Sequence, residues 1–138
     1  AVVAGRGRGE METRVRRRKE KEMASATTTT DPAIEDLAGV VWRLWRAADL
    51  AFQAAGPEGD LELDLLSMAA RNLAWVGADL LADEHRGLCD VPASAERVPA
   101  ALIREAEQVL AARPVEQWPV GVSRLMVEVC DLVREHGR

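Results

Sequence analysis

The chain has 138 residues, a formal net charge of −5 and 48% hydrophobic residues, which indicates one globular domain with room for a charged extension. Its two cysteines are too few for the disulfide framework of a small secreted protein. It has no apolar run near the ~20 residues of a membrane-spanning helix, and it begins without the apolar segment of a signal peptide. We therefore expect a cytoplasmic protein with no membrane partner.

The composition predicts an all-α fold. Alanine, leucine and valine dominate the apolar residues, whereas the chain has no tyrosine and a single phenylalanine. Alanine and leucine favour helices, and the β-branched and aromatic clusters that mark strands are scarce. The basic residues are nearly all arginine, a bias that a GC-rich bacterial genome would produce without any functional role for arginine.

Residues 1–30 are predicted to be a disordered charged tail that ends in a threonine-rich linker. Residues 1–22 carry eight basic and four acidic side chains, a net charge of +4, which leaves −9 for the rest of the chain. The tail has no apolar face whose burial would offset the entropy cost of folding. Nucleic-acid binding by residues 1–22 stays open, but we favour a solvated charge run because the glutamates halve the charge. Met11 and Met23 are both candidate translation starts.

The first predicted helix begins at Asp31-Pro32, because Asp is a preferred N-cap and Pro suits the first helical position. Residues 56–59 are a Gly-Pro-Glu-Gly turn that ends this helix and makes the next one its antiparallel neighbour. Its apolar residues recur at spacings of three and four and form a broad core face, with Trp45 and Phe52 beside it. That face comprises Ile34, Leu37, Val41, Leu44, Ala48, Ala51 and Ala55.

The second predicted helix is capped by Asp60 and spans residues 60–84, and we expect it to be the centre of the fold. Small residues such as Gly77 would allow another helix to approach it closely. Its core face comprises Leu63, Leu66, Ala70, Leu73, Gly77 and Leu80, widened by Leu65, Ala69, Val76 and Leu81.

The same helix carries a second apolar stripe, formed by Leu61, Met68 and Trp75, which we call the Trp75 stripe. At about 100° per residue these three side chains lie roughly opposite the core face. The polar residues on the same side are Arg71, Asn72 and Asp79.

Two interpretations of the Trp75 stripe are open. Residues 85–98 could fold back over it, with Leu88 and Val91 as the cover. Alternatively the stripe is a contact surface, because Trp, Met and Arg are enriched at interface centres. In that case Arg71 would stack on the Trp75 ring, and Asp79 would pair with a cation of the partner.

The C-terminal half is predicted to hold two further helices after a long loop over residues 85–98. One helix starts at Pro99 and closes at Arg113, and the other opens at Pro119. Because the first and third connections are short, the four helices predict a small antiparallel bundle with up-down-up-down order over residues 31–138.

No arrangement of residues indicates a metal, a cofactor or catalysis. His85, Cys89, Cys130 and His136 would meet at one end of an up-down-up-down bundle, but neither half has a recognised zinc-ligand spacing. The chain lacks the Glu-x-x-His pairs of di-iron bundles, a phosphate-binding loop and a nucleophile elbow. We therefore predict no metal site, no cofactor and no catalytic residue.

The favoured function is a non-enzymatic interaction module that homodimerises or binds a protein partner through the Trp75 stripe. A first alternative is a small-molecule-binding bundle or enzyme whose pocket is lined by Trp75, Arg71, Asn72 and Asp79. In that pocket Arg71 would hold an anionic group and Asp79 a hydrogen-bond donor. A second alternative is an accessory protein that binds nucleic acid through residues 1–22.

Overall fold

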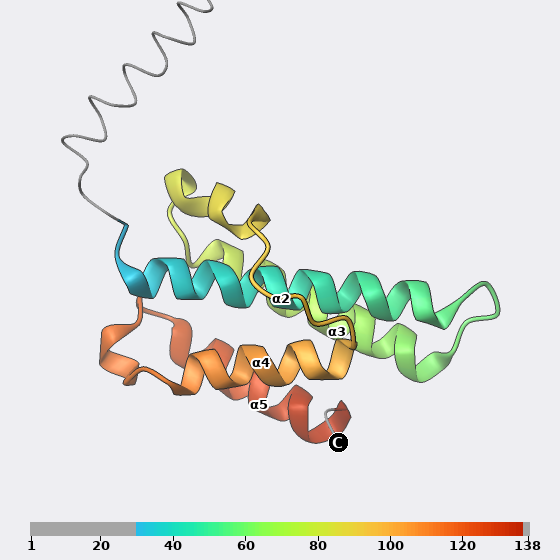
Figure 1. The fold of residues 1–138 in the computed structure, drawn as a ribbon. Coiled ribbons are helices and arrows are strands. Elements are labelled where there is room, and N and C mark those ends of the chain that lie inside the picture. Colours follow the sequence, from blue (N-terminus) through green and yellow to red (C-terminus); the bar gives the residue numbers. More distant parts are fainter. Residues whose placement is uncertain (1–29, 137–138) are drawn as a thin grey trace, which may run out of the picture. The chain divides into compact units, whose positions relative to one another are not determined.

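The structure is a computed structural model, and it describes residues 30–136 (Figure 1). All regular elements in this part of the chain are helices, which confirms the predicted all-α class. The predicted tail lies outside the described residues except for Thr30. None of the described helices has the length and apolar content needed to span a membrane. The elements are α2 (Pro32–Ala55), α3 (Leu61–Asp79), η1 (Asp83–Asp90), α4 (Pro99–Ala111), η2 (Val115–Gln117) and α5 (Val122–His136), of which η1 and η2 are short 3₁₀ helices.

The α2–α3 hairpin follows the prediction. Gly56 and Gly59 adopt φ values of 71° and 73°, which only glycine adopts without strain, and they reverse the chain. The Asp60 side chain then accepts a hydrogen bond of 3.1 Å from the Leu63 backbone N–H and caps α3. Between the two helices, buried Ser67 donates a hydrogen bond of 2.8 Å from Oγ to the Ala48 carbonyl.

Replacing Asp60 by alanine should lower the free energy of unfolding by about 1 kcal/mol, because the first turn of α3 loses its acceptor. Asp60→Asn keeps an oxygen at the same place and should lose much less. Urea denaturation of both variants measures the difference. Equal losses in the two variants would contradict a capping role for this side chain.

The direction of the last two helices corrects the predicted up-down-up-down order. Asp36, near the start of α2, forms an ion pair of 2.5 Å with Arg113, just beyond the end of α4. Arg43, further along α2, forms an ion pair of 2.9 Å with Glu105, which comes earlier in α4. Helix α4 therefore runs antiparallel to α2 and parallel to α3. Figure 1 shows α5 running back beside α4, antiparallel to it. The resulting order is up-down-down-up.

The cause is the segment of residues 91–98, which is not helical and crosses from one end of α2 toward the other (Figure 1). Eight extended residues can span about 26 Å, enough to return the chain to the far end of the fold before α4 begins. Arg43 Nη2 fastens this crossing to α2 by a hydrogen bond of 3.0 Å to the Ala93 carbonyl.

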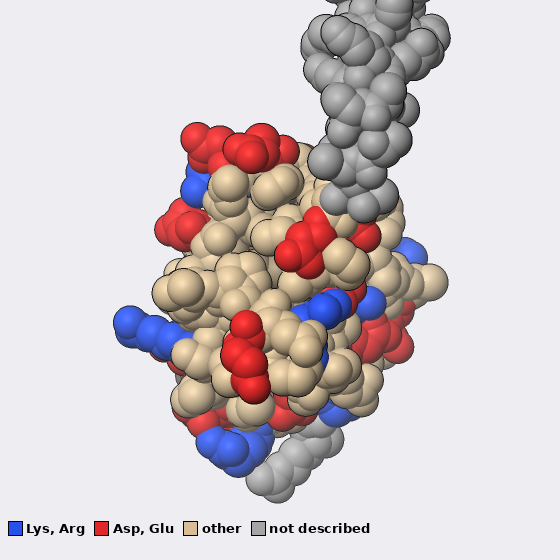
Figure 2. Space-filling view, turned by 90° about the vertical axis from the view of Figure 1, so that its left-hand side faces the viewer, with Lys and Arg blue, Asp and Glu red and all other residues tan. Residues whose placement is uncertain are grey.

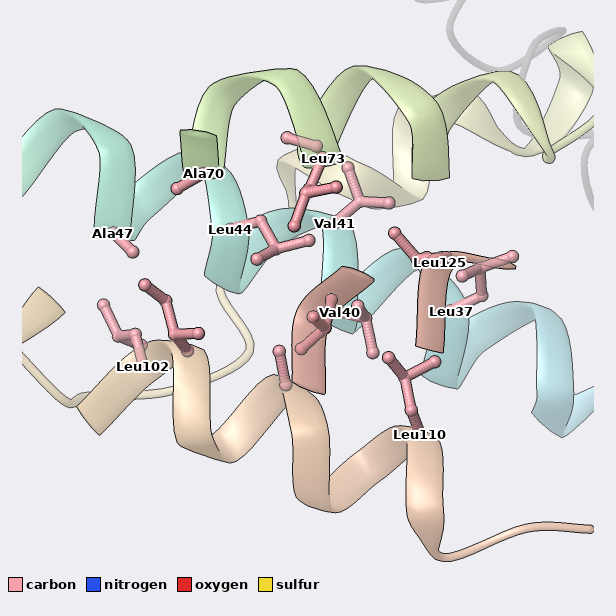
Figure 3. Close-up of a cluster of buried hydrophobic side chains, with 14 of the residues drawn as sticks. Leu37, Val40, Val41, Leu44, Ala47, Ala70, Leu73, Leu102, Leu110 and Leu125 are labelled. Carbon is pink, nitrogen blue, oxygen red and sulfur yellow. The ribbon is translucent and has the colours of Figure 1, made fainter. Parts of the chain in front are cut away.

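Helix α2, rather than α3, is the central helix. It packs against α3, α4 and η1, whereas α3 packs against α2 and α5. Figure 3 shows side chains from all four long helices converging in one core. The labelled members are Leu37, Val40, Val41, Leu44 and Ala47 of α2, Ala70 and Leu73 of α3, Leu102 and Leu110 of α4, and Leu125 of α5.

Several predicted boundaries and core positions differ from the structure. Helix α3 ends at Asp79 rather than at residue 84, and the turn that follows carries Leu81 into the core. Helix α5 begins at Val122 rather than at Pro119, because Gly121 has a φ of 98°, which no α-helix contains. Phe52, expected beside the core face, is 65% exposed.

Candidate interaction surface

The Trp75 stripe is exposed to solvent in the described part of the chain. Leu61 is 71% exposed, Met68 61% and Trp75 56%, and Leu65, which was predicted to widen the core face, is 49% exposed on the same side. A soluble monomer rarely exposes large apolar side chains in a continuous row. The stripe therefore requires an explanation that folding of these residues does not supply.

Residues 85–98 do not cover the stripe, so the interpretation as an internal contact is wrong for the described residues. Helix η1 packs against α2. Leu88 and Val91 line a cavity of about 270 Å³ together with Glu35 and Gly39 of α2. Residues 83–98 thus lie along α2 and not along α3.

Helix α2 extends the apolar surface. Asp49 follows Trp45 by four residues, and Phe52 follows Asp49 by three, so the three side chains share one face of α2. The Trp45 and Trp75 rings meet edge to face with centroids 5.3 Å apart, which places this face at the edge of the stripe. We call the exposed side chains of Phe52, Leu61, Leu65, Met68 and Trp75 the apolar patch. Together they expose on the order of 500 Å², near the upper end for the largest patch on a typical monomer.

Arg71 lies at the edge of the apolar patch, but its contacts differ from the prediction. Its guanidinium lies 5.5 Å from the centroid of the Trp45 ring, not over Trp75. Its Nη2 is also 3.5 Å from the Asp49 carboxylate. Arg71 thus joins α3 to α2 and supports the Trp45–Trp75 pair from one side.

The other two predicted polar residues diverge. Exposed Asp79 lies 3.9 Å from Arg86 of η1, beyond the end of α3. Asn72 lines a cavity of about 330 Å³ with Leu73 and residues of α5, including Asp131. The structure therefore brings Arg71 and Trp75 together through Trp45, and it leaves Asn72 and Asp79 at separate places along the stripe.

A cavity of about 590 Å³ lies on the other side of Trp45. It separates α2 from η1 and from the segment after it, and its lining mixes aromatic and charged groups. Trp75, Arg71 and Asp79 do not line it. The lining residues are Trp42, Trp45, Arg46, Asp49, Cys89, Asp90, Ser94, Ala95, Glu96 and Arg97.

The two thiols are in environments that favour the protonated form. Burial and the charge of Asp90 raise the pKa of the Cys89 thiol, although Arg86 opposes them. Burial and a hydrogen bond with Glu107 raise the pKa of Cys130. A thiol with a raised pKa holds little nucleophilic thiolate at neutral pH.

The four His and Cys residues weighed as zinc ligands do not meet. His136 lines a cavity with Asp60 at the start of α3, whereas Cys89 follows the end of α3. Because α5 runs antiparallel to α3, the ends of these two helices lie at opposite ends of the fold. Within residues 30–136 there is no group of three or more His, Cys, Asp or Glu side chains that could hold a metal ion.

The polar connection made by Arg43 was not predicted. This side chain is 16% exposed, and its Nε donates a hydrogen bond of 2.9 Å to Glu105 Oε1. Burial raises the pKa of Glu105, but hydrogen bonds from Ser94 and Arg43 and the charge of Arg43 outweigh it, and the pKa is lowered. Periodicity carries no signal for such a pair, because its partner is 62 residues away.

The lowered pKa of Glu105 predicts a specific loss of stability in acid. The ionised carboxylate contributes stability above the ordinary glutamate pKa, and this contribution is lost as the pH falls through the lowered folded-state value. Glu105→Gln should therefore be about 1 kcal/mol less stable than wild type near pH 7, and the difference should be smaller near pH 3. Urea denaturation at the two pH values measures this. A difference independent of pH would contradict the role given to the carboxylate.

Trp118 lies between the predicted helix end at Arg113 and the predicted start at Pro119, and the structure buries it. Its Nε1 donates a hydrogen bond of 3.1 Å to the Leu110 carbonyl near the end of α4. The Arg113 guanidinium lies 5.2 Å from the centroid of its ring. The ring therefore fastens the connection between α4 and α5, and its role is structural.

Charged side chains are mixed on the end of the molecule where α2 begins and α4 ends. In Figure 2, acidic and basic side chains alternate with uncharged ones over this face. A duplex-binding face would instead gather Lys and Arg. This face therefore adds nothing in favour of nucleic-acid binding by the helical region.

The apolar patch thus consists of five exposed side chains on the neighbouring helices α2 and α3, edged by the Arg71–Asp49 pair. It is the feature of the described residues that points most directly to a function. Comparison of the chain with protein-family models, with curated proteins and with solved structures found no match.

Proposed function

We propose that the chain is a non-enzymatic interaction module that binds a protein, either a second copy or another partner, through the apolar patch. The observation that carries this proposal is the exposure of Leu61, Met68 and Trp75 along one side of α3. Covering one such side chain contributes about 1.5–3 kcal/mol. Trp and Met with an adjacent Arg are the residue types enriched at interface centres.

The scaffold of this surface in the proposal is a four-helix bundle with up-down-down-up order. The pairings support it, since α2 packs against α3 and α4, while α5 packs against the same two helices. Such a scaffold would hold the apolar patch on two neighbouring helices and so limit the entropy lost on binding. The two free cysteines fit the reducing cytoplasm as its compartment.

The test compares Trp75→Ala with Val127→Ala, which truncates an exposed side chain of α5 away from the patch. We expect Trp75→Ala to abolish association, measured as solution mass and as recovery of a partner, because Trp is among the residue types whose truncation costs an interface most. Val127→Ala should behave as wild type, and circular dichroism should show that both variants keep their helix content. Wild-type protein that is monomeric and recovers no partner would contradict the proposal.

A second candidate is a small-molecule site. The cavity of about 590 Å³ beside Trp45 supports it, because two indole rings and Arg46 could take an aromatic anion. The pocket first expected at Trp75, Arg71 and Asp79 has no comparable support. A thermal-shift screen of aromatic and acidic metabolites would reveal a ligand, and uniformly unchanged melting temperatures would count against this candidate.

A third candidate, nucleic-acid contact through residues 1–22, rests on their charge of +4 and concerns residues outside the described part. It predicts salt-sensitive oligonucleotide binding that is lost when residues 1–22 are deleted. An oligonucleotide that binds neither chain would end it.

A further inference from the structure

We propose that the apolar patch binds a second copy of this chain, with the two α3 helices packed antiparallel about a two-fold axis at Met68. This inference rests on the proposed function and commits it to one partner. Two features support it. When a second copy of α3 runs in the opposite direction, the apolar side chains of the two copies face one another, and so do their opposite charges.

The spacing of the stripe is symmetric about Met68. Leu61 lies seven residues before it and Trp75 seven residues after it. An antiparallel copy centred on Met68 therefore faces Leu61 with the partner's Trp75, and Trp75 with the partner's Leu61. Large and medium apolar side chains would meet in both halves, as in an isologous interface.

The charges at the edge of the stripe are complementary in the same arrangement. Asp64 and Arg71 lie at the edge of the stripe that faces α2, about 20° apart around the helix axis. A two-fold axis perpendicular to the helices keeps this edge of both copies on the same side. Asp64 then faces the partner's Arg71 in both halves, whereas in a parallel pair this edge of the two copies would lie on opposite sides of the interface and the two charges would not meet.

The contribution of α2 fits the same axis. The hydrogen bond between Ser67 and Ala48 sets the register of the hairpin, so Phe52 lies about level with Leu63. In the antiparallel pair, that level faces the residues around the partner's Trp75. Phe52 is 65% exposed and lies on the edge toward which Trp75 leans to meet Trp45. Its exposure, unexplained in the single chain, would bring an aromatic contact across the interface.

Cysteine cross-linking tests the axis directly. Facing Cα atoms of two packed helices are roughly 4–6 Å apart, within the reach of a disulfide. In the full chain with Cys130→Ser, Met68→Cys should form a disulfide-linked dimer under mild oxidation. Leu61→Cys should not, because its two copies would be about 21 Å apart along the axis. The Cys130→Ser parent, which keeps the buried Cys89, is the control.

A charge exchange tests the second argument. Asp64→Arg and Arg71→Asp should each raise the dimer dissociation constant about 30-fold, since each places like charges opposite one another. The double variant should return to within a few-fold of wild type. Arg71→Asp also breaks the contact with Asp49, but Asp64→Arg does not restore that contact, so recovery measures the pairing between copies.

The outcomes separate this inference from the proposed function. Efficient cross-linking of both cysteine variants, or of neither, would overturn the antiparallel pairing at Met68. So would a double charge variant as weak as the single ones. A wild-type chain that stays monomeric, while Trp75→Ala abolishes binding of a different protein, would overturn the second copy as partner and leave the proposed function standing.

Discussion

Replacing Gly77 by leucine is expected to lower the free energy of unfolding by about 2–3 kcal/mol. A Cβ atom at Gly77 would lie 2.8 Å from Val41 Cγ2 and 3.4 Å from Leu125 Cδ2, so even a methyl group displaces its neighbours. Leucine would force α3 away from α2 and α5, and the close-packed core cannot absorb that volume. Urea denaturation monitored by circular dichroism measures the loss.

The matched control is Gly87→Leu, because nothing lies within 4 Å of a Cβ atom at Gly87. This variant should stay within about 0.5 kcal/mol of wild type. A double-mutant cycle adds a second control, since Val41→Ala removes the methyl group that Gly77→Ala would meet. The two changes together should cost less than the sum of the single changes. Strict additivity would contradict the close approach of α2 and α3 at this point.

Replacing Arg43 by methionine is expected to lower the free energy of unfolding by about 2–3 kcal/mol. The substitution keeps most of the side-chain volume but removes the hydrogen bonds to Glu105 and to the Ala93 carbonyl. It leaves a half-buried carboxylate without its cation and loosens the segment that directs α4. Chemical denaturation measures the loss.

The control for Arg43 is Arg124→Met. Arg124 pairs with Glu128 four residues later on the exposed surface of α5, with its side chain 82% exposed. Such pairs contribute little, so this variant should lose at most about 0.5 kcal/mol. If Arg43→Met lost no more than this control, the role of Arg43 in fixing the crossing segment would be wrong.

The sequence was sufficient to predict that the four long helices form, but not where each of them ends or that η1 forms at the predicted loop. The Asp31-Pro32 start, the turn at residues 56–59 and the cap at Asp60 are local signals, and the structure confirms each of them. The direction of α4 was not predictable in the same way. It depends on whether residues 91–98 turn back or cross over. The hydrogen bond between Arg43 and Ala93, which holds the crossing against α2, joins residues that are 50 positions apart.

The candidate site was predictable only in part, because local periodicity shows which residues of one helix share a face but not how two helices pack together. Helical periodicity placed Leu61, Met68 and Trp75 on one face, and the structure leaves all three exposed. Periodicity within α3 could not show that Phe52 of α2 lies beside them. Nor could it show that Arg71 lies over Trp45 instead of Trp75, because these contacts depend on how α2 packs on α3.

The most direct test of the interface is the solution mass of the full chain over a range of concentrations, compared with Met68→Arg. By sedimentation equilibrium, the wild-type mass should rise from 15.1 kDa toward twice that value as the concentration increases. Met68→Arg places two like charges at the proposed axis and should remain at the monomer mass with unchanged helix content. If wild type and Met68→Arg give the same mass at every concentration, the patch is not an interface between two copies of this chain.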